Sequence, residues 1–279
     1  HFMHYRDYLE YHGDRFTDFS LLFFNSKKKL VGIMPAANVQ GELISHPGLT
    51  FGGILIREDL KYDIYENIFT ALCEFVEKDQ SINSITIKPT PYIYHSSPAD
   101  EILYSFYRKK FEVIQTDLCS VIDLRNVIPF SKGRLRSIKK AHEYRLELKC
   151  SDNLHDYWAL LSSVLFTRHG VKPVHTLSEM KLLMDFFPNN VKCFTAINEG
   201  ICIAGTIMFE TNTVSHIQYM ATSEVGRKIG GLHWLIDKLI EKYSGKKKYF
   251  SFGISTENAG KQLNYGLLQQ KERFGARSI

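Results

Sequence analysis

Apolar residues along the chain follow two spacings, every second residue or every three to four residues. The first spacing predicts strands and the second predicts helices. Near the start, two apolar runs flank the polar turn Asn25-Ser26-Lys27-Lys28-Lys29, which is typical of a β-hairpin covering 19–35. The other elements predicted in this part are a strand at 49–57, a helix at 64–76, a strand at 82–88, a helix at 98–110 and a strand at 118–124.

The later part of the chain begins with a polar stretch containing Pro and Gly, 125–133, which we interpret as a linker. A basic helix follows, and a second hairpin covers 192–209 around Asn198-Glu199-Gly200. The other elements predicted here are helices at 154–166 and 178–187, a strand at 214–222, a helix at 232–240 and a strand at 249–253.

The two parts share one order of elements. Each has a hairpin, then a Ser-His pair entering a strand (Ser45-His46 and Ser215-His216), then a helix, a strand and a final helix. This pattern predicts an internal duplication of one α/β unit, with domains at 1–125 and 126–279. Because the chain opens with His-Phe-Met rather than an initiator Met, we expect the first domain to be trimmed.

A glycine-rich turn at 223–231 separates the predicted strand 214–222 from the following helix. It carries Gly226, Arg227, Lys228, Gly230 and Gly231. Glycines allow close backbone approach, and unpaired N–H groups at a helix start attract anions, so these five residues are our candidate donor-binding site for a phosphate or pyrophosphate. The alternative is a turn whose glycines serve only chain geometry. The corresponding turn in the first half, 57–61, is acidic and lacks glycine, which disfavours a phosphate there.

Composition narrows the functional classes. Of the 279 residues, 44% are hydrophobic and 23% are charged, which predicts a packed core and excludes a disordered chain. A net charge of +5 is compatible with anionic ligands but too small for a dedicated DNA-binding protein. The five cysteines are scattered without C-x-x-C spacing, which indicates small buried hydrophobes, a reducing compartment and no metal site. With no membrane-spanning stretch or signal peptide in sight, the expected localisation is cytoplasmic.

Two cationic stretches leave alternatives open. The run Lys27–Lys29 is interpreted as an exposed turn, with a binding patch as the alternative. The basic helix from Arg134 to Ala141 is either a solvated helix face or a cationic strip that faces the substrate.

Three segments resemble one family of enzymes. They are the basic helix Arg136–Ala141, the strand His216–Thr222 and a tail containing Phe252-Gly-Ile-Ser, Asn264-Tyr-Gly-Leu and Lys271-Glu-Arg-Phe-Gly275. Together they resemble the FemAB-like branch of the GNAT-type acyltransferases. The resemblance implies a mixed α/β fold of two tandem GNAT-like domains, each with a mostly antiparallel twisted sheet flanked by helices. The sequence departs from the family in two ways. Residues 227–231 only approximate the family's pyrophosphate-binding pattern. The long helical-hairpin arm of some tRNA-dependent members is absent.

The resemblance also implies an activity. It is the transfer of an acyl or aminoacyl group to an amine or hydroxyl of a cell-envelope sugar or peptide precursor. The expected co-substrate is acetyl-CoA or another acyl-CoA, with aminoacyl-tRNA as the alternative, and a lipid-linked precursor is a further possible partner. In relatives the lysine matching Lys271 lies beside the donor and acceptor groups, and the acyl arm lies between the two strands 214–222 and 247–254, which part.

Acyl transfer needs an oriented acceptor and stabilisation of the oxyanion. Our catalytic candidates are Lys271, His216 and His175, with Glu257 behind the histidines. For either histidine the alternative is a hydrogen-bonded structural residue, and for Lys271 it is a surface lysine whose ammonium reaches water. Strict alternation places His216, Gln218 and Met220 on one face of their strand and Ile217 and Tyr219 on the other. The substrate-binding candidates are His46, Arg136, Lys140, His169, Gln218 and Tyr219.

Duplicated α/β units often hold ligands at their interface, so we expect His46, Arg136, Lys140, His169 and His175 to line a cleft for an anionic acceptor. A rival hypothesis from another class is a non-catalytic ligand-binding module that retains the GNAT fold. Binding of tRNA is possible but not favoured, because no aromatic–basic repeat is present.

Overall fold

The computed structural model describes residues 1–11, 13–151 and 154–279, and the chain divides into two compact units. The N-terminal unit covers 1–114 and the C-terminal unit covers 115–279. The fold of both is mixed α/β, as predicted. The boundary lies earlier than the predicted one at 125, because the strand β7 (Cys119–Asp123) pairs with strands of the C-terminal unit.

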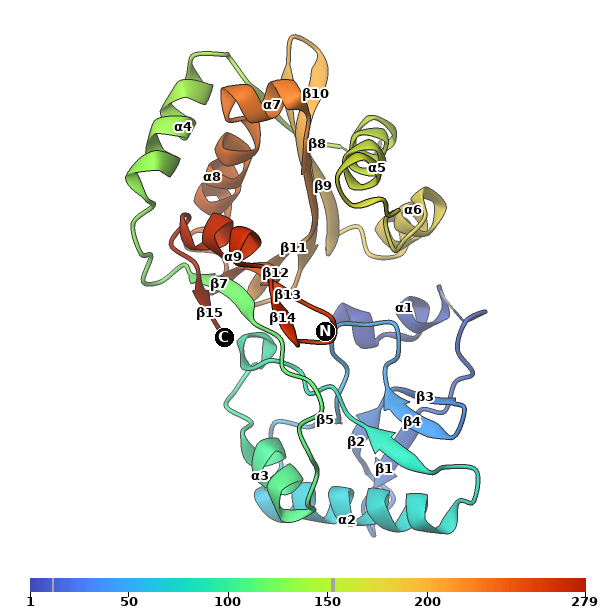
Figure 1. The fold of residues 1–279 in the computed structure, drawn as a ribbon. Helices are drawn as coiled ribbons and strands as arrows, with labels where there is room; N and C mark the ends of the chain where they lie inside the picture. Colours follow the sequence, from blue (N-terminus) through green and yellow to red (C-terminus); the bar gives the residue numbers. More distant parts are fainter. Residues whose placement is uncertain (12, 152–153) are drawn as a thin grey trace. The chain divides into compact units, whose positions relative to one another are not determined.

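The N-terminal unit contains two three-stranded sheets (Figure 1). One has the order β1-β2-β5, and its hairpin of β1 and β2 confirms the predicted one. The other has the order β3-β4-β6, with β3 and β4 antiparallel and β4 and β6 parallel. The strand bounds are β1 Leu21–Phe24, β2 Leu30–Met34, β3 Ala36–Val39, β4 Glu42–Ser45, β5 Leu55–Ile56 and β6 Ser84–Thr86.

Helix α2 supplies much of this unit's core. Its buried residues Tyr65, Ile68, Phe69 and Leu72 recur at helical spacing, and the last three pack with the strands. The predicted strand 49–57 shrinks to β5, because Gly52 and Gly53 turn the chain and the N–H of Gly52 donates to the carbonyl of Lys88 (2.9 Å). The helices are η1 Phe2–His4, α1 Arg6–Glu10, α2 Tyr62–Lys78, η2 Tyr92–Tyr94 and α3 Glu101–Arg108.

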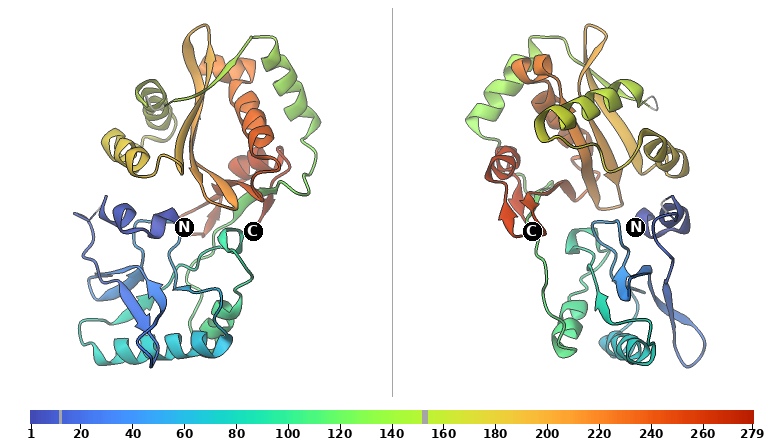
Figure 2. Two further views of the ribbon diagram at one scale, coloured as in Figure 1. Left: turned by 180° about the vertical axis from the view of Figure 1, so that it is seen from behind. Right: turned by 45° about the vertical axis from the view of Figure 1, so that its right-hand side comes forward.

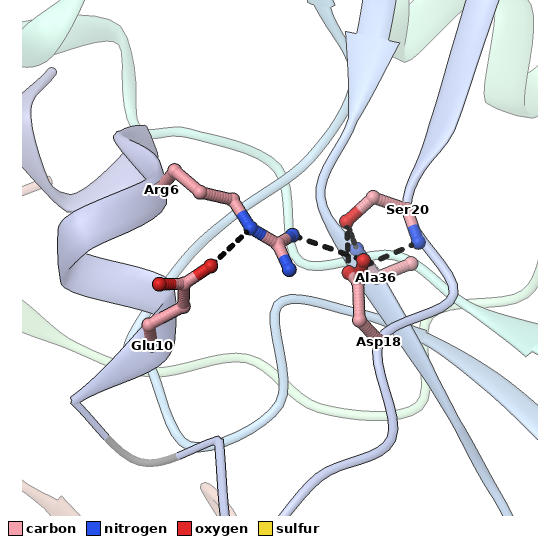
Figure 3. A network of polar contacts seen from close by, with 5 residues as sticks. All are labelled: Arg6, Glu10, Asp18, Ser20 and Ala36. Carbon is pink, nitrogen blue, oxygen red and sulfur yellow. Dashed lines mark hydrogen bonds and ion pairs between the residues drawn. The ribbon is translucent and has the colours of Figure 1, made fainter.

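A polar network ties α1 to the base of the first hairpin (Figure 3). The Arg6 guanidinium donates to both Glu10 and Asp18 at 2.9 Å. Asp18 accepts from the Ser20 hydroxyl (2.6 Å), whose oxygen accepts the N–H of Ala36 (3.3 Å). Because Ser20 immediately precedes β1, these bonds hold the hairpin at its base.

The C-terminal unit is built on one sheet with the order β15-β7-β12-β11-β10-β9-β8. Its pairs are antiparallel except β11 with β12, which is parallel. The hairpin of β9 and β10 confirms the second predicted hairpin. The strand bounds are β8 Glu147–Cys150, β9 Val191–Asn198, β10 Ile201–Glu210, β11 Val214–Thr222, β12 Tyr249–Ile254, β13 Thr256–Glu257, β14 Gln262–Leu263 and β15 Arg277–Ser278.

Helices cover both faces of this sheet (Figures 1 and 2). On one face lie α5 (His155–His169) and α6 (Leu177–Phe186); on the other lies α8 (Gly231–Tyr243), with α4 (Lys132–His142) packed outside it. Buried Leu235, Ile236 and Leu239 of α8 join the main core. The remaining helices are α7 Glu224–Ile229 and α9 Tyr265–Glu272. Of the five cysteines, which we expected to be buried, Cys193 is buried, Cys73, Cys119 and Cys202 are partly buried, and Cys150 is exposed.

Candidate active site

The strands β11 and β12 diverge in the middle of the sheet. Their parallel register contains Val214 with Tyr249, Ser215 with Phe250 and His216 with Ser251, and then stops. Beyond His216, β11 continues to pair with β10 only. The predicted parting of these strands is therefore confirmed, and it begins at His216 and Ser251.

A narrow apolar crevice lies where the strands have separated, with no room for a water molecule in this conformation. Met220 of β11 and Phe252 of β12 line its two sides. The other lining residues come from α8, α9 and the residues after α9: Leu232, Ile236, Gln270, Lys271 and Phe274. The crevice is thus a gap in the sheet that helices cover from one face.

Lys271 is the charged residue of this crevice, and its side chain is only 2% exposed. Its ammonium donates to the carbonyls of Gly253 (3.0 Å) and Ile254 (2.5 Å) and to the Ser255 hydroxyl (3.0 Å). Burial lowers the pKa of Lys271 to about 8. The alternative of a surface lysine reaching water is therefore wrong, because all three N–H groups bind protein oxygens. A catalytic role stays a prediction.

His216 and Ser251 form a side-chain pair at the point of divergence. The His216 Nδ1 lies 3.0 Å from the Ser251 Oγ, and the Cys119 Sγ lies 3.7 Å from the same hydroxyl. Burial, followed by the nearby Lys271 charge, lowers the pKa of His216 to about 4, so its imidazole is neutral at pH 7. Sequence reasoning missed Ser251 and Cys119. Ser251 follows from placing 214–216 beside 249–251 in parallel register.

His175 and Tyr219 are two predicted site residues that the fold brings together. The His175 Nδ1 lies 2.8 Å from the Tyr219 hydroxyl, which also accepts the backbone N–H of His175 (3.3 Å). The Tyr219 ring makes an edge contact with Trp158 of α5. His175 is buried by these contacts, so the structural alternative for this histidine is satisfied whether or not it also acts on a substrate.

A bulge in β11 overturns the predicted alternation of its side chains. Ile207 pairs with Tyr219, but the next residue, Met208, pairs with Ile217, so Gln218 is the extra residue. Ile217 and Met220 consequently pack into the same core cluster, although strict alternation puts them on opposite faces. The side chains of 216–220 therefore do not follow the single pattern that we predicted.

The predicted donor turn 223–231 is not an open turn, because most of it is the short helix α7. Its glycines make close backbone contacts. A Cβ on Gly226 would lie 2.3 Å from the Ile203 carbonyl oxygen, one on Gly230 would lie 2.6 Å from the Ser137 carbonyl oxygen, and one on Gly231 would lie 2.8 Å from Ile203 Cδ1. The chain-geometry interpretation of the glycines therefore has direct support, and the donor-binding role of 226–231 stays a prediction.

The two cations of this segment are exposed. The Arg227 guanidinium pairs with Glu224 (2.5 Å) on the same helix. The Lys228 carbonyl accepts a hydrogen bond from the Lys140 ammonium of α4 (3.0 Å), which links these two predicted site segments. Arg136, on the same helix as Lys140, is exposed.

The basic helix also contains a structural arginine that sequence reasoning missed. Arg134 is buried, its guanidinium lies 4.0 Å from the centre of the Phe274 ring, and it donates to the Gln270 carbonyl (3.0 Å). On the same helix, the Ser137 hydroxyl lies 2.7 Å from the His233 Nδ1 of α8. One face of α4 thus anchors α8 and α9, while Arg136 and Lys139 face solvent.

The remaining predicted residues are spread over the chain. His46 belongs to the N-terminal unit, where it is buried with its Nε2 2.7 Å from the Met3 carbonyl oxygen. The side chain of His169 lies outside the described residues. Glu257 accepts from the Asn264 amide (2.8 Å). The cleft that we expected from His46, Arg136, Lys140, His169 and His175 stays a prediction.

Among the described residues, no group of three or more histidine, cysteine or acidic residues has the geometry to hold a metal ion. No helix within the described ranges is long and apolar enough to cross a bilayer.

Comparison with known proteins bears on the fold. No family model and no curated protein matches the sequence. Among solved structures, FemX is similar over 100% of this chain and 90% of its own, with a TM-score of 0.70 and 11% identity. The C-terminal domain of a lysylphosphatidylglycerol synthetase from Agrobacterium fabrum is similar over 93% of this chain and 82% of its own, with a TM-score of 0.60 and 10% identity.

A third similar structure is L-PGS from Bacillus licheniformis, with a TM-score of 0.59 and 12% identity over 98% of this chain and 90% of its own. The chain therefore has a FemAB-like, GNAT-type fold, which confirms the predicted resemblance at the level of fold.

Proposed function

We propose that this chain is an acyltransferase of the FemAB-like GNAT type. It would move an acyl or aminoacyl group from a CoA thioester, or from an aminoacyl-tRNA, to an amine or hydroxyl of a cell-envelope sugar or peptide precursor. One observation carries the proposal: β11 and β12 diverge after His216 and Ser251, and the buried ammonium of Lys271 lies at the resulting crevice. The fold shared with FemX and lysylphosphatidylglycerol synthetase supports the substrate class.

The proposed reaction needs stabilisation of the oxyanion. The acceptor nitrogen or oxygen attacks the acyl carbon, the bond to sulfur or to the tRNA oxygen breaks, and the acceptor proton leaves with a base. With a pKa of about 8, Lys271 is mostly protonated at neutral pH and can offset the negative charge that develops on the acyl oxygen. To contact that oxygen directly, the ammonium has to exchange one of its three acceptors for it.

His216 would orient groups in this site rather than take the proton. A histidine with a pKa of about 4 is a weak base at neutral pH, because an efficient general base has a pKa near the working pH. The hydrogen bond between the Ser251 hydroxyl and Nδ1 holds the ring in one orientation. We propose His175, whose Nδ1 lies 2.8 Å from the Tyr219 hydroxyl, as the base, with bulk solvent as the alternative.

The donor's phosphates would lie at the joint between α7 and α8. The α8 start at Gly231 provides N–H groups, and Arg227 and Lys228 are exposed beside it. Arg227 would have to leave Glu224 to contact a phosphate.

Two assays test the proposal. The purified chain is mixed with acetyl-CoA and longer acyl-CoAs plus amino sugars, nucleotide sugars or peptidoglycan peptides, and free thiol is measured. In parallel, transfer from aminoacyl-tRNA is followed with a labelled amino acid. Transfer from either donor is the expected result. If calorimetry detects no donor binding and neither assay gives product, the enzyme proposal is wrong and a non-catalytic binding module takes its place.

A further inference from the structure

The hairpin of β1 and β2 exposes an apolar face at a sheet edge. Leu21 and Phe23 pack against the core of the N-terminal unit, while the alternate residues Leu22 and Phe24 are 60% and 58% exposed. Leu30 pairs with Phe24 across the hairpin and is 43% exposed, so these three side chains share one face. An edge strand with exposed apolar residues invites association with another surface.

The turn beside this face is strongly cationic and well ordered. Lys27, Lys28 and Lys29 are all exposed, and no Asp or Glu occurs between Asp18 and Glu42. The Asn25 side-chain oxygen accepts the N–H groups of Lys27 and Lys29, both at 3.0 Å, which fixes the turn. The network of Arg6, Asp18 and Ser20 holds the opposite end of the hairpin (Figure 3). The protein thus presents three lysines and three apolar side chains on a fixed support.

We infer that this hairpin docks on an anionic lipid bilayer. Phe24, Leu30 and Leu22 would enter the boundary between headgroups and acyl chains, and the three lysines would lie among the anionic headgroups. Both kinds of side chain have a partner in this arrangement. RNA would engage the lysines but leave Leu22 and Leu30 without a role. A second copy of the chain would bring three further positive charges to the same turn. The inference is independent of the proposed acyl transfer.

Vesicle binding tests the inference with the whole chain. We expect binding to vesicles of phosphatidylcholine with 30% phosphatidylglycerol, and little binding to phosphatidylcholine alone. A lysine near an anionic surface contributes about 1 kcal/mol, or about fivefold in affinity. Lys27→Gln with Lys29→Gln should therefore weaken binding by about 25-fold. The matched control is Lys246→Gln with Lys248→Gln, two exposed lysines of the C-terminal unit that remove the same charge, and it should change binding by less than about threefold.

The apolar face is tested separately. Phe24→Ser with Leu30→Ser should weaken binding by about tenfold or more, because each buried apolar side chain contributes to insertion. Its control is Ile201→Ser, at a residue that is 68% exposed in the other hairpin. Circular dichroism and thermal unfolding verify that each variant is folded. In a Phe24→Trp variant, the fluorescence emission of the new tryptophan should shift to shorter wavelength when anionic vesicles are added. The native Trp158 and Trp234 are buried, so their emission should not change.

Three results would overturn the inference. Equal binding to neutral and anionic vesicles is one. Loss of binding with the lysine variant but not with the serine variant is another, because it indicates diffuse electrostatic adsorption. The third is a hairpin variant that changes the association state in sedimentation without lipid and leaves vesicle binding intact, because the face would then be a contact between copies.

Discussion

The two units of the molecule share one strand arrangement, in which two parallel strands diverge and leave a gap in the sheet. The groups that fill this gap differ between the units. In each, a strand pairs antiparallel with its predecessor and parallel with a strand that follows a helix: β4 with β6, and β11 with β12. The parallel pairing stops at Ile44 with Thr86 in one unit and at His216 with Ser251 in the other. A serine–histidine pair lies at or next to both stops.

In the N-terminal unit the chain's own backbone fills the gap. The Ser45 hydroxyl accepts the N–H groups of Lys88 (2.8 Å) and Gly53 (3.4 Å), and His46 binds the Met3 carbonyl. In the C-terminal unit the gap contains a crevice with the Lys271 ammonium. The comparison teaches that the divergence of the strands is a property of the topology, whereas the groups that fill the gap differ: backbone and polar side chains in one unit, and apolar side chains with a buried ammonium in the other.

The largest expected effect comes from removing the charge at the gap of the C-terminal unit. Lys271→Met keeps most of the stem and deletes the ammonium, and we expect turnover to fall by about 100- to 1,000-fold, or roughly 2.7–4 kcal/mol. The variant also leaves the carbonyls of Gly253 and Ile254 without this donor, so some stability is lost as well. Steady-state kinetics and thermal unfolding separate the two effects.

The control for this variant lies in the gap of the N-terminal unit. Lys88 is partly buried, its ammonium donates to the Leu49 carbonyl (3.0 Å), and burial lowers its pKa. Lys88→Met should leave turnover within about threefold of the parent. If Lys271→Met also stays within threefold for turnover and donor affinity, the catalytic assignment is wrong and the two gaps are functionally alike.

The next effect concerns the glycines of the predicted donor-binding turn 223–231. Gly226→Ala places a methyl group against the Ile203 carbonyl, and we expect a loss of about 1–3 kcal/mol in the free energy of unfolding. Chemical denaturation measures it. Gly133→Ala is the control, because a Cβ there meets nothing within 4 Å and alanine favours the helix. If Gly226→Ala leaves the denaturation midpoint unchanged but weakens donor binding, the glycine serves ligand binding rather than backbone packing.

A charge reversal tests the same segment without disturbing packing. Arg227→Glu with Lys228→Glu replaces two cations by two anions beside the start of α8, and each charge near a helix end contributes about 0.3–1 kcal/mol. Donor affinity should therefore fall by roughly tenfold or more, measured by calorimetry with acetyl-CoA. Lys61→Glu, at the start of α2 in the N-terminal unit, makes a matched comparison and should leave the affinity intact. Undiminished affinity in the double variant would move the donor site elsewhere.

The smallest effect is on the pH dependence of stability. The unfolded His216 binds a proton near pH 6.5, whereas the folded one does so only near pH 4. Between these values the unfolded state holds more protons, so stability falls as the pH drops from about 6.5 to 4. His216→Gln should flatten this slope in thermal unfolding measured from pH 7.5 to 4.5. His4 of the N-terminal unit, whose pKa burial lowers to about 3, keeps its own contribution. A slope unaffected by the substitution contradicts the lowered pKa of His216.

Local pattern was enough to predict the parts of the fold that depend on local contacts. The hairpins around Asn25 and Asn198, and the helix after Gly231, follow from alternation, turn residues and helical spacing. The sheet membership of β7 did not follow from its sequence, because its apolar run is compatible with either unit and only pairing with β12 decides it.

The candidate site shows the same limit. The parallel pairing of 214–216 with 249–251 could have been predicted from the sequence, and it identifies Ser251 as the partner of His216. The bulge at Gln218 could not have been predicted, because one extra residue in an otherwise regular apolar strand does not change the sequence pattern recognisably. The burial of Lys271 depends on three acceptors from residues 253–255, at and just after the end of β12, whereas helical spacing alone put this residue only at the edge of an apolar stripe.

The tight joint between α7 and α8 has a consequence for tracing the history of this fold. Gly226, Gly230 and Gly231 face Ile203 and Ser137 too closely for any side chain, independent of a ligand. A descendant would be under pressure to keep all three, whether or not the segment binds a donor. In an evolutionary comparison, conservation of these glycines would therefore indicate that the backbone conformation is inherited, and not that a ligand is. Under the proposed donor site, divergence at the exposed Arg227 and Lys228 would be the informative trace of a changed co-substrate.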